Sequence, residues 1–530
     1  MSSLSFLDRE RSVAGPGYSR WLVPPAALAI HLCIGQVYAL SVFKRPLVAR
    51  FETSETAIAI VFSIAIVMLG LSAAFGGKWM ERNGPRKAMF VSAVCFSSGL
   101  LIGSLGISTG QLWLLYLGYG FVGGIGLGIG YISPVSTLIK WFPDRPGLAT
   151  GMAIMGFGGG AFIASALSAR LLSGYTSLPA DQPPTDALVP AFVTLGLAYL
   201  VFMMFGVFTV RVPPEGWKPA GWTPKEAGTD KMMTTANVSA DNALRTRQFW
   251  FLWVVLFCNV TAGIGILEQA APMIRDFFPD DVTPATAAGF VGLLSLFNMA
   301  GRFVWSSTSD YIGRKPTYMI YLGVGAVLFF FLATAGNTSV PVFVLLACVI
   351  ISFYGGGFAT VPAYLKDMFG TFQVGAIHGR LLTAWSAAGV AGPLIVNVIT
   401  ENQRESGVTG AAAYRPSLLV MVGLLGLGFL ANCWCDQWRT STTRQLPTPI
   451  PRPFSRNRPL SAVAAGSAQP RRHRKDSDES PELDAGCPDG HGAADEGRAV
   501  RLAFAWAFVG IPLTFGVFET AKKAAALFTG

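Results

Sequence analysis

Residues 297–316, FNMAGRFVWSSTSDYIGRKP, combine a membrane-spanning pattern with charges that such a segment normally excludes. The stretch begins apolar, carries Arg302 among apolar residues, and leaves through a tight charged turn from Ser309 to Lys315. A charged side chain inside a hydrophobic span is costly, so it is expected to face a cavity or a partner. The rest of the chain therefore has to provide an environment for Arg302.

The composition indicates an integral membrane protein. The 530-residue chain is 52% hydrophobic and only 13% charged, whereas soluble domains average about 25% charged residues. The formal net charge of +10 lies in short loops and tails between apolar runs, which is a topology signal and argues against nucleic acid as a partner. The seven cysteines lack metal-ligand spacing, so no metal, disulfide or cofactor is predicted.

Apolar runs long enough to cross a bilayer, about 20 residues each, occur in two groups of six. The first group lies near 21–43, 57–77, 88–107, 112–140, 150–172 and 189–211, and the second near 249–274, 286–307, 316–335, 340–365, 375–400 and 416–434. The chain is therefore predicted to be an all-α membrane protein with twelve transmembrane helices in two six-helix bundles, plus a candidate thirteenth helix at the C-terminus.

These runs divide the chain into six regions. They are an N-terminal tail (1–20), a first bundle (21–212), a central loop (213–248), a second bundle (249–435), a linker (436–500) and a C-terminal hydrophobic helix (501–530). The linker is rich in Pro, Gly, Ala and charged residues, a composition that predicts disorder. The last helix could span the membrane or lie in its interface.

Lysine and arginine determine the predicted orientation. If the N-terminus is cytoplasmic, the basic residues near 78–87, 140–145, 218–247 and 314–315 are all cytoplasmic as well. The opposite loops keep few cations, with those at 44–50 the main exception. The tail, the central loop and the linker are therefore expected in the cytoplasm.

The two bundles repeat each other in sequence. Pro134, Trp141, Gly147 and Gly151 correspond to Pro362, Phe369, Gly375 and Gly379 at one separation (362 − 134 = 228). Glu81, Gly84 and Arg86 correspond to Asp310, Gly313 and Lys315 at a separation of one residue more (310 − 81 = 229). Matches over such a distance indicate duplication of a six-helix unit, with both copies in the same orientation.

Two charged loops occupy equivalent places in the repeat. They contain Glu81, Arg82, Gly84 and Arg86 in the first copy, and Asp310, Gly313, Arg314 and Lys315 in the second. The acid can pair with basic residues and with the positive N-terminus of a neighbouring helix, while the glycine permits a tight turn. Such loops could latch helices together in one conformation and release them in another; the alternative is that they are only positive-inside loops.

The loops resemble the signature of the major facilitator superfamily, G-x-x-x-D-R-x-G-R-K, between its second and third and its eighth and ninth helices. The chain departs from that signature at Glu81 (for Asp), Pro85 (after the glycine) and Ser306 (for the first glycine). The resemblance implies a major facilitator fold.

Five runs in the twelve-span body resemble one branch of that superfamily, the oxalate/formate antiporter family. They are GQVYALSVFKRPL (35–47), NVTAGIGILEQAAPM (259–273), NMAGR (298–302), GGGFATVPAYLKDMFG (355–370) and GAIHGRLLTAWSAAGVAGP (375–393). In addition, residues 501–530 resemble a small one-span polypeptide that accompanies some of these transporters. Here it is fused to the chain.

The family resemblance implies that Arg302 binds the carboxylate of a substrate. A guanidinium facing a cavity can bind a carboxylate through two parallel hydrogen bonds, which agrees with that role. The alternative is an arginine that extends to the nearby membrane surface. The oxalate carrier also uses a lysine after a Thr-Ala pair, whereas Thr383-Ala384 is followed here by Trp385. One cation beside an aromatic wall favours a monocarboxylate or a larger, less charged acid over oxalate, and Arg380 is only a weak substitute for the lysine.

The resemblance also implies an aromatic pocket, for which the alternative is ordinary helix packing. By position in the matched runs, the predicted substrate contacts besides Arg302 are Tyr38, Tyr131, Phe157, Tyr354, Phe358 and Trp385, with Gln36 as a polar contact. Glu268 is the candidate proton site, or alternatively an acid of the outer vestibule. His31 and His378 are as readily satisfied by neighbouring polar groups as used for function.

The sequence therefore predicts a secondary active transporter of small organic anions that works by alternating access. Anion exchange is favoured over proton symport, because no acid is convincingly placed within the membrane. A proton-coupled monocarboxylate symporter and a transport-inactive sensor are the alternatives. An enzyme is not expected, since no catalytic cluster occurs at membrane depth. The expected setting is a monomer in a bacterial-type inner membrane, with lipid and a small carboxylate as its partners.

Overall fold

This computed structural model describes residues 5–179, 182–222, 237–435 and 499–511, together with residues 514 and 518. Within this part of the chain, eleven helical segments are long and apolar enough to cross a membrane. A further helix of 29 residues, α11 (Pro284–Ile312), carries Arg302. Each of the twelve predicted spans therefore corresponds to a long helical segment. The predicted linker, apart from residues 499 and 500, lies outside the described residues.

The first half begins with short 3₁₀ turns and contains six long helical segments. The turns are η1 (Ser5–Leu7), η2 (Arg9–Ser12) and η3 (Arg20–Leu22). Two of the long segments are composite: α1 (Val23–Ile34) continues into η4 (Gly35–Phe43) and α2 (Lys44–Phe51), and α5 (Leu112–Leu115) continues into η5 (Tyr116–Val122) and α6 (Gly123–Trp141). The other four are α3 (Glu55–Asn83), α4 (Pro85–Thr109), α7 (Pro146–Tyr175) and α8 (Leu188–Thr209). A short helix, α9 (Ala240–Leu244), follows in the central loop.

The second half repeats this arrangement. Its long segments are α10 (Arg247–Phe277), α11, α12 (Arg314–Met319) with η6 (Ile320–Val324) and α13 (Gly325–Ala335), α14 (Val340–Phe369), α15 (Val374–Leu381) with α16 (Thr383–Glu405), and α17 (Ala411–Cys433). Many large apolar side chains are exposed on the outer helix faces, among them Phe75, Val201 and Leu345. Because a bilayer solvates such surfaces, this exposure agrees with a membrane protein.

The first span is longer than its apolar run and contains a tighter stretch in the middle. Residues Gly35–Phe43 form a 3₁₀ helix between α1 and α2. Gly35 lies against α7, where a Cβ atom would stand 2.2 Å from the carbonyl oxygen of Phe157. The close approach of the two backbones therefore requires glycine, and it fixes the following turn, which carries Gln36 and Tyr38.

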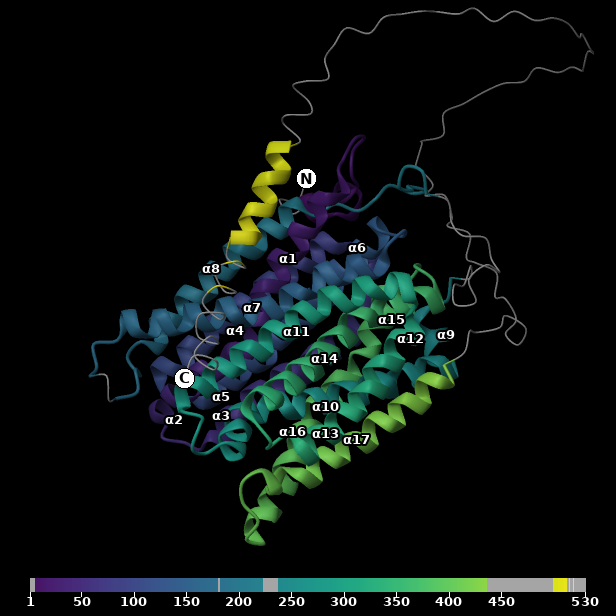
Figure 1. The fold of residues 1–530 in the computed structure, drawn as a ribbon. Coiled ribbons are helices and arrows are strands. Elements are labelled where there is room, and N and C mark those ends of the chain that lie inside the picture. Colours follow the sequence, from purple (N-terminus) through teal and green to yellow (C-terminus); the bar gives the residue numbers. More distant parts are fainter. Residues whose placement is uncertain are drawn as a thin grey trace, which may run out of the picture. The chain divides into compact units, whose positions relative to one another are not determined.

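The two halves meet mainly at two places. α7 packs on α11, and α3 packs on the span formed by α15 and α16. Figure 1 shows the purple and blue helices of the first half beside the teal and green helices of the second. Small residues allow the approach, as Gly147 and Gly151 face α11 while Gly379 faces the backbone of α3. At these glycines the two halves therefore pack backbone to backbone.

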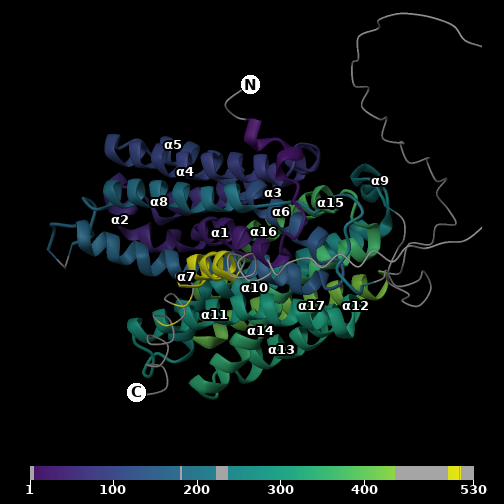
Figure 2. The ribbon, with the colours of Figure 1, turned by 90° about the horizontal axis from the view of Figure 1, so that it is seen from above.

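A C-terminal helix, Ala499–Ile511, packs on the first half, next to α8 in Figure 1 and over α1 and α7 in Figure 2. The Phe508 ring stacks on Phe202 of α8 with centroids 4.4 Å apart, and the Trp506 indole donates to the carbonyl oxygen of Trp21 at 3.2 Å. Thirteen helical residues extend about 20 Å, less than the roughly 30 Å hydrocarbon core. Whether this helix spans the membrane stays a prediction, because most of the residues after 511 lie outside the described chain.

Candidate functional site

Arg302 is fully buried near the middle of α11. Its Nε donates to Asn298 Oδ1 at 3.1 Å and one terminal nitrogen donates to the carbonyl oxygen of Ile154, in α7 of the other half, at 3.3 Å. The second terminal nitrogen, Nη2, has no hydrogen-bond partner within the described chain. Its full burial shows that the side chain does not extend to the surface. A buried cation with an unused donor is a suitable receptor for an anion.

Six aromatic side chains form a continuous set of ring contacts beside Arg302, here called the aromatic cage: Tyr38, Tyr131, Phe157, Tyr354, Phe358 and Trp385. The guanidinium carbon of Arg302 lies 5.6 Å from the Phe157 centroid and 5.2 Å from that of Phe358. Trp385 contacts both of these rings, with centroids 5.5 and 4.5 Å apart.

The cage draws residues from both halves of the chain. Tyr38 packs on Phe157 with centroids 5.3 Å apart, and its hydroxyl lies 3.4 Å from that of Tyr354 in the second half. Tyr131 joins Phe157 and Trp385 across the same boundary, with centroids 5.4 Å from each. The structure therefore brings together all the aromatic residues predicted from the sequence.

Three other candidates have their described contacts outside the aromatic cage. Gln36 is buried, and its Oε1 accepts a hydrogen bond from the Tyr119 hydroxyl at 2.9 Å. Glu268 is exposed on α10 and interacts electrostatically with Lys44. Arg380 directs one terminal nitrogen to Asp241 at 2.7 Å. None of the three makes a described contact with the cage.

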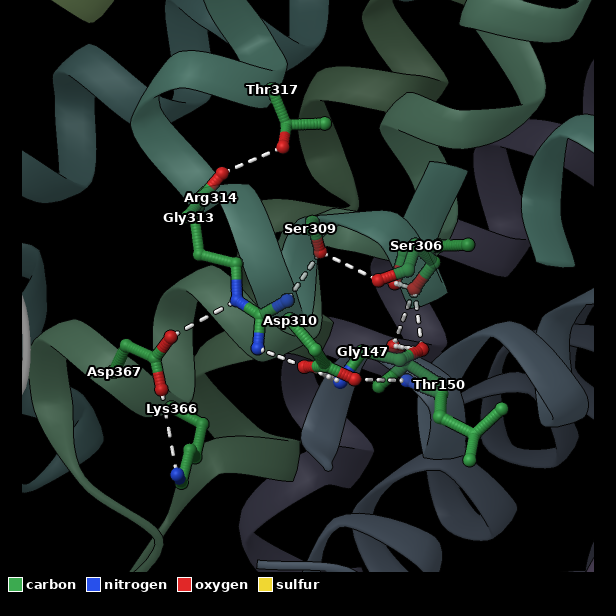
Figure 3. A network of polar contacts seen from close by, with 12 residues as sticks. Gly147, Thr150, Ser306, Ser309, Asp310, Gly313, Arg314, Thr317, Lys366 and Asp367 are labelled. Atoms are coloured by element: carbon green, nitrogen blue, oxygen red, sulfur yellow. Dashed lines mark hydrogen bonds and ion pairs between the residues drawn. The ribbon is translucent and has the colours of Figure 1, made fainter. Parts of the chain in front are cut away.

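The second charged loop joins the halves through Asp310, as Figure 3 shows. The Asp310 carboxylate accepts hydrogen bonds from the backbone N–H groups of Gly147 and Leu148, both 2.8 Å long, at the start of α7. It also pairs with Arg314 at 2.5 Å, and Arg314 in turn contacts Asp367 at 3.0 Å. An acid of the second half thus caps a helix of the first, where the helix dipole favours negative charge.

The first charged loop makes the equivalent contact in the opposite direction. Glu81 accepts a hydrogen bond from the backbone N–H of Gly375 at 3.1 Å, beside the start of α15 in the second half. Within its own half it accepts from Ser136 at 2.8 Å and pairs with Lys140 at 2.6 Å. Gly147 and Gly375 are equivalent positions of the repeat, so the two contacts are reciprocal. Together they are called the reciprocal latch below.

The remaining loop residues have other positions. Gly84 and Gly313 have φ angles of +89° and +92°, which glycine adopts without strain, as the predicted tight turns require. Arg86 donates to the carbonyl oxygen of Val210, just after α8, at 3.2 Å, and Lys315 donates to that of Cys433, at the end of α17, at 2.7 Å. These cations therefore secure the last helix of each half rather than the boundary between halves. Arg82 is exposed.

A third contact between the halves comes from the central loop. Asp241, on α9, pairs with Lys78 at the end of α3 and with Arg380 on α15. The hydrogen bond from Lys78 and, to a lesser extent, the one from Arg380 lower the pKa of Asp241 below its usual value. The face that carries both charged loops is therefore closed at three places.

Sequence reasoning did not assign Asp367 and Lys140 to the latch, where they complete its ion pairs. It left the roles of His31 and His378 open; both lie against Tyr131, with ring centroids 5.4 and 5.9 Å away. The sequence repeat did contain a signal for the latch. Gly147 and Gly375, whose backbone N–H groups the two acids bind, are separated by the same number of residues as the neighbouring matched pairs of the repeat.

A family model described as "Major Facilitator Superfamily" matches residues 26–393 and 284–473. The chain belongs to the major facilitator superfamily. One relative is the "Uncharacterized MFS-type transporter YhjX" of Escherichia coli K12, which is 26% identical over 366 residues (68% of this chain, 83% of the relative). Another is the "Oxalate:formate antiporter" of Oxalobacter formigenes, which is 26% identical over 380 residues (71% of this chain, 83% of the relative).

Solved structures agree with this assignment. The major facilitator transporter FucP in its outward conformation aligns with a TM-score of 0.58 at 13% identity, covering 79% of this chain and all of FucP. The predicted all-α major facilitator fold and the relationship with the oxalate/formate antiporter family are confirmed. The protein is an integral membrane transporter of a family whose members are transporters rather than enzymes.

Proposed function

We propose that this transporter carries small monocarboxylates by alternating access, and that it exchanges one acid for another. The observation that carries the proposal is Arg302, a fully buried cation with an unpartnered Nη2 beside two aromatic rings. Within the described chain no carboxylate forms an ion pair with it. Burying an uncompensated charge costs several kcal/mol, which a bound carboxylate would offset.

The names of relatives support an organic anion as the cargo. Besides the oxalate:formate antiporter, they include the "Apicoplast pyruvate carrier 1" of Toxoplasma gondii, 27% identical over 389 residues (64% of this chain, 69% of the relative). Exchange is favoured over proton symport because Glu268, the candidate proton site, is exposed and makes no described contact with Arg302. Arg302, the aromatic cage and Gln36 remain the proposed substrate contacts.

The reciprocal latch supports a gating role for the charged loops. We place these loops in the cytoplasm of a bacterial-type inner membrane, with the N-terminus on the same side, because the loops are rich in Lys and Arg. The described arrangement then has its cytoplasmic side closed. Opening would separate Asp310 from α7 and Glu81 from α15.

The test is uptake of labelled acid into proteoliposomes that contain the purified full chain. Preloading with unlabelled acid should accelerate uptake, and Arg302→Ala should reduce it about 100-fold or more, as loss of a buried charged contact costs at least about 3 kcal/mol. Arg404→Ala is the matched control, because Arg404 lies in the same half but is half-exposed and pairs with Asp276. Uptake by Arg302→Ala at the parent rate would exclude the role of Arg302, whereas no uptake of any acid by the parent would favour a sensor.

A further inference from the structure

The cage contains a second group of polar atoms that have no hydrogen-bond partner among the described residues. Tyr131 Oη, Trp385 Nε1, His31 Nε2 and both ring nitrogens of His378 are buried without hydrogen-bond partners. Each of these side chains is no more than 1% exposed. Buried polar atoms in folded proteins almost always have partners, so such a cluster indicates a ligand.

These atoms surround one ring and adjoin Arg302. Tyr131 is central, with its ring centroid 5.4 Å from those of His31 and Trp385 and 5.9 Å from that of His378. The Phe157 ring contacts both Tyr131 and the Arg302 guanidinium. Arg302 and this group, here called the neutral subsite, are therefore neighbours within the cage, and the side chains of Arg302 and Tyr131 also interact directly.

The neutral subsite offers donors and acceptors but no fixed charge. His31 Nδ1 lies 3.1 Å from the carbonyl oxygen of Ala27, a bond that uses its proton and leaves Nε2 of the neutral ring as an acceptor. A neutral His378 has one donor and one acceptor, Tyr131 can serve as either, and Trp385 only donates. Within the described chain, Arg302 is the one cation that contacts the cage rings.

We infer that the neutral subsite binds an uncharged oxygen of the substrate, next to a carboxylate held by Arg302. This inference rests on the proposed function and specifies its substrate class: small monocarboxylates with a 2-oxo or 2-hydroxy group. A carbonyl oxygen accepts from Tyr131, Trp385 or His378, and a hydroxyl can also donate to His31. A plain carboxylic acid of the same size leaves these atoms unpaired, and a second carboxylate finds no second cation.

The experiment compares uptake of pyruvate, lactate, propionate and oxalate by the full chain in proteoliposomes. Pyruvate and lactate should be taken up at least tenfold better than propionate, which has the same number of carbons but lacks the second oxygen function, and better than oxalate. In Tyr131→Phe and His378→Phe, the ratio of pyruvate to propionate uptake should fall severalfold towards one. These variants keep a ring in place while removing the polar atoms.

Tyr199→Phe is the matched control. The Tyr199 hydroxyl is also buried without a hydrogen-bond partner among the described residues, but its ring packs on Phe96 of α4 and makes no described contact with the cage. The pyruvate-to-propionate ratio should not change in this variant. Binding of pyruvate and propionate measured by thermal stabilisation of the detergent-solubilised protein provides the same ratio for a variant with too little activity.

The possible outcomes separate the two proposals. If the parent carries propionate or oxalate as well as pyruvate, or if neither Tyr131→Phe nor His378→Phe changes the ratio, the inference is wrong while the carrier function stands. If the parent carries no acid at all, both fail. A selective parent whose selectivity is lost in the two ring variants and kept in Tyr199→Phe supports the subsite.

Discussion

Arg302 is surrounded by groups that tolerate its charge without neutralising it. Two carbonyl-type oxygens accept from the guanidinium, and the faces of Phe157 and Phe358 provide cation–π contacts. Each cation–π contact contributes about 0.5–2 kcal/mol, less than the cost of burying an unpaired charge. The site therefore retains an attraction for an anion that a salt bridge would have removed.

In contrast, Asp241 is exposed and pairs with two cations, so we expect its titration to make the closed face pH-dependent. If contacts in one arrangement lower the pKa of a carboxyl, that carboxyl stabilises the arrangement at every pH above its ordinary pKa. The stabilisation is lost as the pH falls through the lowered pKa. We therefore expect acidification to favour opening of this face, by up to about fivefold in population, since exposed ion pairs contribute about 1 kcal/mol or less.

The measurement is the distance between spin labels at positions 82 and 311, which are both exposed and adjoin Glu81 and Asp310. The labels are introduced in a cysteine-free background. In Asp241→Asn the longer distance should already be populated at neutral pH, and the response to acid should be weaker. An unchanged response in this variant would assign the pH dependence to another carboxyl.

Single residues of the cage were predictable, but their partners were not. The six aromatic residues of the cage are predicted from their positions in the runs that resemble the family, and the structure brings their rings together. The sequence pattern leaves the roles of His31 and His378 open, and three of their ring nitrogens have no hydrogen-bond partner within the described chain. For Gln36, a predicted substrate contact, nothing in the sequence indicates the hydrogen bond that it accepts from Tyr119. Such pairings depend on helix rotation, which apolar spans leave undefined because nearly every face is apolar.

At the scale of helices, close backbone approaches serve two different purposes. Gly379 and Gly147 lie between the halves, where a Cβ would stand 2.1 Å from the Ala73 carbonyl oxygen and 2.2 Å from that of Ser306. Gly301 lies within the second half, where a Cβ would stand 2.2 Å from the Ser352 carbonyl oxygen. The first kind of contact must break when this face opens, and the second must persist.

Alanine substitution should distinguish the two kinds of glycine. Gly379→Ala and Gly147→Ala should favour the open face, seen as a longer distance between the labels at 82 and 311, with little change in thermal unfolding. Gly301→Ala should lower the thermal stability, because overpacking a helix contact costs about 1–3 kcal/mol in every conformation. Equal losses of stability in all three variants would show that the glycines between the halves serve static packing alone.

The spans themselves were largely predictable because length and hydropathy determine them. Their interruptions were not. The 3₁₀ stretch Gly35–Phe43 packs on α7, and Thr383, where α16 starts after α15, accepts a hydrogen bond from Trp253 of α10. Both contacts join residues far apart in sequence. Likewise, the repeat identified both charged loops, but only the structure shows that each acid reaches the other half.

On the scale of the whole molecule, the C-terminal helix is associated with the first half. Its described contacts are with Trp21, α1, α7 and α8, and no contact with the second half is described for residues 499–511. We therefore expect it to move with the first half and to stabilise that half rather than to gate transport.

Truncation after Cys435 should test that role. The cluster that contains Phe202, Phe205 and Leu32 loses its aromatic stacking, for which about 0.5–1.5 kcal/mol per pair is expected. Thermal unfolding should therefore occur at a lower temperature, with transport per folded molecule retained. Phe508→Ala in the full chain should reproduce part of the loss, and an added peptide of residues 499–530 should restore it. A truncated protein that is equally stable but inactive would instead indicate a role in the transport cycle.

The reciprocal latch also bears on how the chain arose. In a symmetric homodimer, residue i of one subunit contacts residue j of its partner, and j contacts i in return. Glu81 with Gly375 and Asp310 with Gly147 follow this rule within a single chain. A six-helix ancestor could thus have closed as a dimer before its gene was duplicated and fused. Arg302, whose repeat equivalent is Ala73, breaks the symmetry (302 − 229 = 73). A single binding charge could be placed on one side only after the two subunits had become one polypeptide.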